Sequence, residues 1–145
     1  TDVDSLPALF ESAAPSRRKK GANMGKPTIY LVDDDETVRE SLMWMLDALG
    51  MSARACEDPS TVPLDGAPGC VILDEALAGN VSGLDSVDPS TGLLAGRPVV
   101  LFSGRADAED VRERAQARGV RHILAKPVQV STLMAAVEAA MAEAS

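Results

Sequence analysis

The sequence predicts an α/β protein in which a parallel β-sheet is covered by helices on both faces. Short apolar and β-branched runs alternate along the chain with segments of helical periodicity, and this alternation is typical of βαβ units. The first, third, fourth and fifth of these runs end at a carboxylate, hydroxyl or amine side chain. In an open α/β sheet, the carboxyl ends of the strands form the edge at which ligands bind.

The composition is that of one domain with an aliphatic core. The chain has 145 residues, of which 46% are hydrophobic but only 3% aromatic. A formal charge of -8 argues against direct binding of DNA or RNA, which normally requires a basic surface. We expect a soluble, cytoplasmic protein, because no apolar run reaches the roughly 18 residues that span a bilayer and no signal peptide is visible. Cys56 and Cys70 have neither metal-ligand nor CxxC spacing, and we interpret them as reduced thiols.

The first 26 residues differ in composition from the remainder. They are rich in Ser, Ala, Pro and Gly and contain the basic run Arg17–Lys20, which indicates a linker or tail. The basic run is either part of a solvated linker or a docking patch. The domain itself is predicted over residues 27–145.

The first half of the domain contains two strands and one helix. Thr28–Val32 is a β-branched, apolar run that suits a buried parallel strand. Apolar residues recur at helical spacing from Val38 to Leu49, and Asp35 precedes them as a helix-start residue. Met51–Cys56 is the second predicted strand. Three prolines and two glycines between residues 59 and 69 then leave room for about one helical turn.

The second half contains three strands and two helices. Glycines and a proline between residues 83 and 96 disfavour a helix after the third strand. The predicted strands are Val71–Leu73, Pro98–Phe102 and His122–Ala125, and the predicted helices are Asp107–Arg118 and Val130–Ala144.

The residues that can carry chemistry share one edge of this predicted sheet. Asp33 and Asp34 follow the first strand, and Asp74, Ser103 and Lys126 follow the third, fourth and fifth. Carboxylates close together attract a cation, and Mg²⁺ prefers oxygen ligands. One carboxylate can attack phosphorus to form an acyl phosphate, while a lysine and a hydroxyl stabilise the phosphoryl oxygens.

These motifs resemble the receiver domain of response regulators. The resemblance rests on Leu31–Leu46 (LVDDDETVRESLMWML), Asp74, Ser103-Gly104 and Lys126-Pro127, and it covers residues 27–144. It implies a flavodoxin-like, five-stranded parallel sheet of strand order 2-1-3-4-5 with helices on both faces. From the two Pro- and Gly-rich crossovers, we expect the second and third helices to be short or degenerate.

The resemblance also implies a role for each site residue. Asp33, Asp34, Asp74 and the backbone carbonyl of Ala76 would hold Mg²⁺. Asp74 would accept the phosphoryl group, which Lys126 and Ser103 would contact, and the Lys126-Pro127 bond would be cis. The donor would be a phosphohistidine on a sensor histidine kinase or a histidine phosphotransfer protein. Such a domain is not a conventional enzyme, although it catalyses its own phosphorylation and dephosphorylation. Three contexts fit the sequence: a stand-alone shuttle, a fragment of a larger regulator, or the C-terminal receiver of a hybrid histidine kinase. The linker-like residues 1–26 weakly favour the last.

The sequence departs from the family pattern after Asp74 and before Lys126. Leu77-Ala78 replaces the usual Met-Pro, and Gly83 follows the acceptor by nine positions instead of eight. Ile123 stands where the family carries Tyr or Phe, so the aromatic half of the usual switch is missing. We therefore hypothesise that phosphorylation acts through residues 75–97.

Two other interpretations compete with a phospho-accepting receiver. The first is a pseudo-receiver, which is a docking module of the same fold that is not phosphorylated in the cell. The second is a phosphatase of the haloacid dehalogenase type, because Asp33–Thr37 satisfies DxDxT, with Asp33 as nucleophile and Asp35 as acid/base. That family needs a further acidic pair on a strand, whereas the only acids after Lys126 are Glu138 and Glu143 in the last helix.

Overall fold

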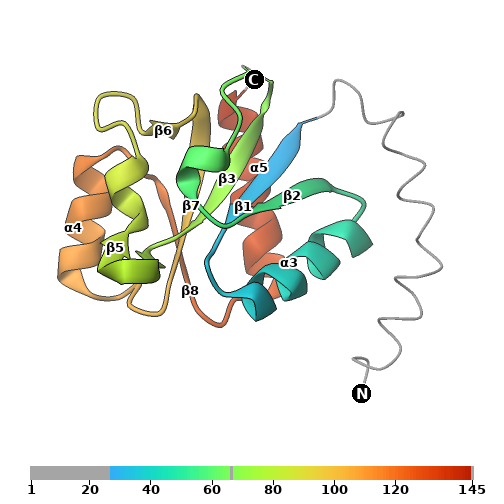
Figure 1. Ribbon diagram of the computed structural model, residues 1–145, viewed down its shortest axis with the longest axis horizontal. Helices are drawn as coiled ribbons and strands as arrows, with labels where there is room; N and C mark the ends of the chain where they lie inside the picture. Colours follow the sequence, from blue (N-terminus) through green and yellow to red (C-terminus); the bar gives the residue numbers. More distant parts are fainter. Residues whose placement is uncertain (1–26, 66, 145) are drawn as a thin grey trace.

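The computed structural model describes residues 27–65 and 67–144, so the linker predicted over residues 1–26 lies outside the described part. Figure 1 shows how the elements are arranged. In chain order, the elements are β1 Thr28–Val32, α3 Glu36–Ala48, β2 Ser52–Cys56, the 3-10 turn η2 Pro59–Thr61, β3 Gly69–Asp74, β4 Ala76–Leu77, η3 Ala78–Asn80, β5 Val81–Ser82, η4 Gly83–Ser86, β6 Leu93–Leu94, β7 Arg97–Ser103, α4 Glu109–Ala117, β8 His122–Ala125 and α5 Val130–Ala144. None of these helices has the length and apolar content that crossing a bilayer requires.

The central sheet has the predicted strand order. Five parallel strands pair in the order β2-β1-β3-β7-β8, in which β7 and β8 are the fourth and fifth strands of the prediction. The predicted bounds of β1, β8 and α5 agree with the structure, and Lys126-Pro127 is cis as expected. This order brings the carboxyl ends of β1, β3 and β7 next to one another at a single edge (Figure 1).

Alternation along the strands divides the core into two layers. Odd-numbered residues of β1 and even-numbered residues of β3 and β7 pack with α3 and α5, whereas their neighbours in sequence pack with α4, η4 and β6. On β3, for example, Ile72 belongs to the α3/α5 layer and Leu73 to the α4 layer. The side chain of Asp74 therefore lies on the same face of the sheet as that of Ile72, and the side chain of Glu75 lies on the same face as that of Leu73.

Short elements take the place of the second and third helices, as the proline and glycine content predicted. Among the residues described between β2 and β3, η2 is the only element, while β4, η3, β5, η4 and β6 lie between β3 and β7. β6 pairs antiparallel with the start of β7 through a turn at Ala95-Gly96. Both turn residues have positive φ, 54° and 83°, which is the requirement of a type I′ hairpin turn. β4, β5 and β6 were not predicted from the sequence, and each has only two residues.

Arg97 is a buried cation at the start of β7. It is 2% exposed, and its Nη1 donates to the backbone oxygens of Pro63 (2.6 Å) and Ala95 (3.2 Å). Its Nη2 pairs with Asp65 Oδ1 at 2.7 Å, and the guanidinium lies 4.6 Å from the centroid of the Tyr30 ring. Arg97 therefore joins the crossover before β3 to β1 and to the β6–β7 turn.

Replacing Arg97 with Met is expected to lower the free energy of unfolding by about 2 kcal/mol, because the charge-assisted hydrogen bonds are lost while the aliphatic stem is kept. Urea denaturation measures this change. Arg112→Met is the matched control, since Arg112 is exposed on α4, and its effect should stay within about 0.5 kcal/mol. Equal midpoints for the two variants would contradict a structural role for Arg97.

Candidate functional site

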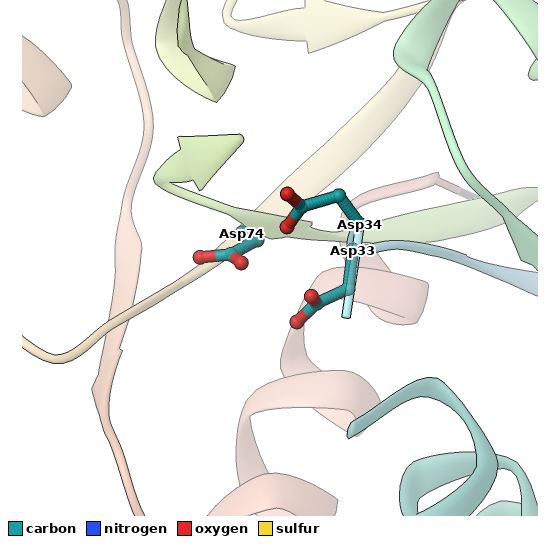
Figure 2. Close-up of side chains that lie close together, drawn as sticks. All are labelled: Asp33, Asp34 and Asp74. Carbon is teal, nitrogen blue, oxygen red and sulfur yellow. The ribbon is translucent and has the colours of Figure 1, made fainter. Parts of the chain in front are cut away.

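Three carboxylates meet at the carboxyl edge of the sheet. Asp33 and Asp34 follow the last residue of β1, and Asp74 is the last residue of β3. One oxygen from each of the three carboxylates lies within 4.8 Å of the others. Figure 2 shows the three side chains gathered beyond the strand ends. Asp33 and Asp74 are buried, whereas Asp34 is exposed.

Asp33 lacks a full set of partners for its charge. Its Oδ1 accepts a hydrogen bond from the backbone N–H of Asp35 at 2.8 Å, but the buried Oδ2 has no hydrogen-bond partner in the part of the chain that the structure describes. Burial, together with the negative charge of Asp74, raises the pKa of Asp33 from its ordinary value of 3.8 to about 6. A cation placed beside Oδ2 would satisfy this oxygen and favour the ionised form.

Lys126 supplies a positive charge from the end of β8. Its Nζ lies 3.2 Å from Asp74 Oδ1 and 3.8 Å from Asp33 Oδ2. The same amine lies 5.0 Å from the centroid of the Phe102 ring, and this cation–π contact helps to hold it over the sheet edge. Lys126 thus faces both buried carboxylates, and its Nζ would also face a group bonded to Asp74.

The chain after β3 remains close to the acidic cluster. The backbone N–H of Ala76 donates to Asp74 Oδ1 at 3.1 Å, which holds the Ala76 backbone beside the carboxylate. A hydrogen bond from Gly83 N–H to the backbone oxygen of Glu75, 2.7 Å long, closes this loop. The role of the Ala76 carbonyl as a metal ligand stays a prediction.

Ser103 lies at the same edge, but its hydroxyl is engaged elsewhere. Its Oγ accepts a hydrogen bond from the backbone N–H of Arg105 at 2.8 Å and donates to Glu75 Oε1 at 3.4 Å. The structure therefore brings Asp33, Asp34, Asp74 and Lys126 together, while Ser103 follows the alternation of β7 toward the α4 layer.

The structure reveals two nearby residues that the sequence analysis did not select. The Nη1 of Arg39 donates to the backbone oxygen of Asp33 at 2.6 Å, which fixes the chain where it leaves β1. Glu75 is buried beside Ser103. No motif marks either residue, although an acid directly after a buried, six-residue strand is itself an unusual feature. Asp35 is the N-cap of α3, as predicted, and its Oδ1 accepts from the backbone N–H of Thr37.

The acidic cluster suits a hard divalent cation. All of its donors are oxygens, and Asp33 Oδ2 accepts no hydrogen bond among the described residues and has only the distant Lys126 amine beside it, so it is free to ligate a cation. Mg²⁺ takes one or two carboxylates and keeps several waters. Asp33, Asp34 and Asp74 would hold the ion, and Lys126 supplies too little charge to neutralise all three carboxylates.

The raised pKa of Asp33 would make binding of Mg²⁺ at this cluster dependent on pH. Binding is expected to weaken by about tenfold for each pH unit below about 6, because the proton and the metal compete for the same carboxylate. In the metal-free protein, the stability of the fold depends on pH in the opposite direction. A raised pKa means that the folded chain holds this proton more tightly, so the contribution stabilises the fold at low pH and is lost as pH rises through about 6.

Calorimetric Mg²⁺ titrations between about pH 5 and 7.5 measure this dependence. Thermal unfolding in a chelator between about pH 4 and 7 measures the second effect, because this range spans the ordinary and the raised pKa of Asp33. Asp33→Asn should remove most of the pH dependence in both experiments. If the wild type bound Mg²⁺ with equal affinity at both ends of the range, the raised pKa of Asp33 would be contradicted.

Comparisons with known proteins agree with this geometry. The family model described as the response regulator receiver domain matches residues 29–138. The transcriptional regulatory protein TdiR of Thauera aromatica is 32% identical over 118 residues, which cover 79% of this chain and 51% of TdiR. The transcriptional regulatory protein FixJ of Azorhizobium caulinodans is 33% identical over 119 residues, which cover 78% of this chain and 54% of FixJ. The chain thus spans about half the length of these relatives.

Solved structures show the same arrangement. Full-length FixJ from B. japonicum superposes with a TM-score of 0.68 and 28% identity, covering 82% of this chain and 59% of that chain. A response regulator receiver protein from Burkholderia phymatum gives a TM-score of 0.66 and 28% identity, covering 81% of this chain and 96% of that one. The fold, the acidic edge and these matches together place the chain in the family of receiver domains of two-component response regulators.

Proposed function

We propose that this receiver domain accepts a phosphoryl group from a phosphohistidine onto Asp74 and signals by a change of conformation. The observation that carries the proposal is the position of Lys126 Nζ, 3.2 Å from Asp74 Oδ1, within a cluster of three carboxylates. A carboxylate that faces a fixed amine beside a cation site can attack an anionic phosphoryl group, which carboxylates alone would repel.

The transfer is balanced in bonds and charge. An Asp74 carboxylate oxygen forms a bond to phosphorus while the bond between phosphorus and the histidine nitrogen breaks, and the imidazole keeps the electron pair and takes up a proton. Lys126 neutralises charge on the phosphoryl oxygens. Bound Mg²⁺ would screen the remaining charge and orient the phosphoryl oxygens. The N–H of Ala76, which now donates to Asp74 Oδ1, is placed to hold the carboxylate during attack.

The donor in this proposal is a sensor histidine kinase or a histidine phosphotransfer protein. The curated relatives are named transcriptional regulators, and the chain matches about half of each.

Incubation with acetyl phosphate, in Mg²⁺ or in a chelator, tests the proposal by intact mass. We expect one phosphoryl adduct that requires Mg²⁺ and is removed by hydroxylamine, which cleaves acyl phosphates. Calorimetry with Mg²⁺ alone separates metal binding from chemistry. An unmodified protein that nevertheless binds Mg²⁺ would favour the pseudo-receiver interpretation, in which the fold serves as a docking module.

A further inference from the structure

Glu75 is a buried acid directly after the proposed phospho-acceptor. It is 7% exposed, and the alternation of β3 directs its side chain toward the α4 layer, opposite to that of Asp74. The pairing of Asp74 with Phe102 places Glu75 beside Ser103 on the neighbouring strand. The Ser103 hydroxyl donates to Glu75 Oε1 at 3.4 Å. A serine hydroxyl has only one proton to donate, so this contact and a contact to a phosphoryl group exclude each other.

A series of charged contacts leads from Glu75 to the segment that replaces the third helix. Glu75 Oε2 lies 3.9 Å from Arg114 Nη1 on α4, and Arg114 Nη2 lies 3.8 Å from Asp85 Oδ1 in η4. Asp85 also lies 3.9 Å from Arg118 Nη2. The Nη1 of Arg118 in turn donates to the backbone oxygen of Val87 at 2.8 Å. Ser103 is thereby connected through side chains to both α4 and η4.

This series of contacts can replace the aromatic half of the family's switch, which the chain lacks because position 123 is Ile. Ile123 packs against the hydrophobic cluster on the α4 face of the sheet, and it has no polar group that could follow a movement of Ser103. Glu75 has such a group and contacts Ser103 directly. It also reaches α4, which Ser103 does not contact in the hydrogen bonds and ion pairs of the described residues.

We propose that Glu75 is a positioning residue that holds the Ser103 hydroxyl away from Asp74 until phosphorylation, and that its release transmits the signal through Arg114 to α4 and η4. This inference rests on the proposed phosphorylation of Asp74. Once the phosphoryl group is present, the Ser103 hydroxyl turns to a phosphoryl oxygen. Glu75 then loses its hydrogen-bond donor and gains a negatively charged neighbour, so it moves toward Arg114. In this position Glu75 competes with Asp85 for the Arg114 guanidinium.

Binding of beryllofluoride in saturating Mg²⁺, followed by calorimetry, tests the positioning role. Glu75→Met removes the acceptor that holds Ser103 and is expected to tighten beryllofluoride binding about fivefold. Glu75→Gln removes the same charge but keeps an acceptor oxygen, so its affinity should lie closer to that of the wild type. Because Gln has the shape of Glu, this variant isolates the effect of the charge. If the Met variant fails to fold, the amide-exchange experiment on Arg114→Met described below still tests the proposal.

A double-mutant cycle with Ser103→Ala asks whether Glu75 acts through Ser103. In the Ser103→Ala background, Glu75→Met should change the affinity by less than about twofold, since no hydroxyl remains to be released. The proposal is overturned if Glu75→Met binds like the wild type, if Gln and Met tighten binding equally, or if the full effect persists without Ser103.

Amide exchange tests the transmission step. In the wild type, beryllofluoride should change protection in residues 83–87 and 109–117. Arg114→Met should bind beryllofluoride but lose this change, whereas the control Glu113→Gln, an exposed position on the same helix, should retain it. An unchanged response in Arg114→Met would overturn the transmission route. A wild type that binds no beryllofluoride and takes no phosphoryl group would instead refute the proposed function, and this inference with it.

Discussion

Asp74→Asn is expected to leave the domain folded and to remove the phosphoryl adduct completely. Asn has nearly the same shape, but its amide is a poor nucleophile toward phosphorus. The substitution also takes one charge from the cluster that includes the buried Asp33. Lowering this repulsion should raise the melting temperature of the metal-free protein by a few degrees. The variant would therefore lose phosphorylation while gaining stability, so the lost phosphorylation could not be attributed to unfolding.

Intact mass after incubation with acetyl phosphate and Mg²⁺ gives the first readout, and thermal unfolding in a chelator gives the second. Asp107→Asn is the matched control, because Asp107 is an exposed acid in the loop after β7, near the same sheet edge. It should be phosphorylated like the wild type. An adduct of equal yield on the Asp74→Asn protein would show that another residue is the acceptor.

The sequence was sufficient to predict the sheet because its signals are local. β1 and β8 are bounded by charged and glycine-containing segments that end the apolar runs, and both have the predicted limits. The prolines and glycines in the crossovers correctly predicted degenerate helices, because those residues exclude the helical backbone. They did not predict β4, β5 and β6, since two-residue pairings leave no periodicity to detect.

The acidic edge was also predictable from sequence, whereas the state of Ser103 was not. Any residue that ends a parallel strand lies at the carboxyl edge, so the strand order places Asp74 and Lys126 at one edge. Because β7 lies between their strands, the 3.2 Å contact also requires the length of the lysine side chain. The direction of the Ser103 hydroxyl depends on a partner from another strand, Glu75, and on the backbone N–H of Arg105. Such contacts depend on side-chain conformation, which spacing along the chain does not determine.

Gly83→Ala is expected to destabilise the domain by about 2 kcal/mol and to slow phosphorylation of Asp74 by about 100-fold. A Cβ at position 83 would overlap the backbone oxygen of Asp74 and lie 3.0–3.1 Å from the side chain of Leu73. Since a backbone oxygen has little freedom to move, the chain at Asp74 must shift. The hydrogen bond from Gly83 N–H to the Glu75 oxygen, 2.7 Å long, ties the two segments together and transmits this displacement.

Gly104→Ala is the matched control, because a Cβ at Gly104 would meet nothing within 4 Å and the residue has no positive φ. This glycine adjoins Ser103, so the comparison keeps the substitution near the same edge of the sheet. Urea denaturation and the rate of adduct formation from acetyl phosphate are the two measurements. Equal stability and equal rates for the two variants would show that the loop after β3 can move away from Asp74 without cost. If phosphorylation slowed by more than the loss of stability accounts for, the result would show that Gly83 sets the position of the acceptor. The reason is that a small displacement of a nucleophile slows transfer far more than it weakens packing.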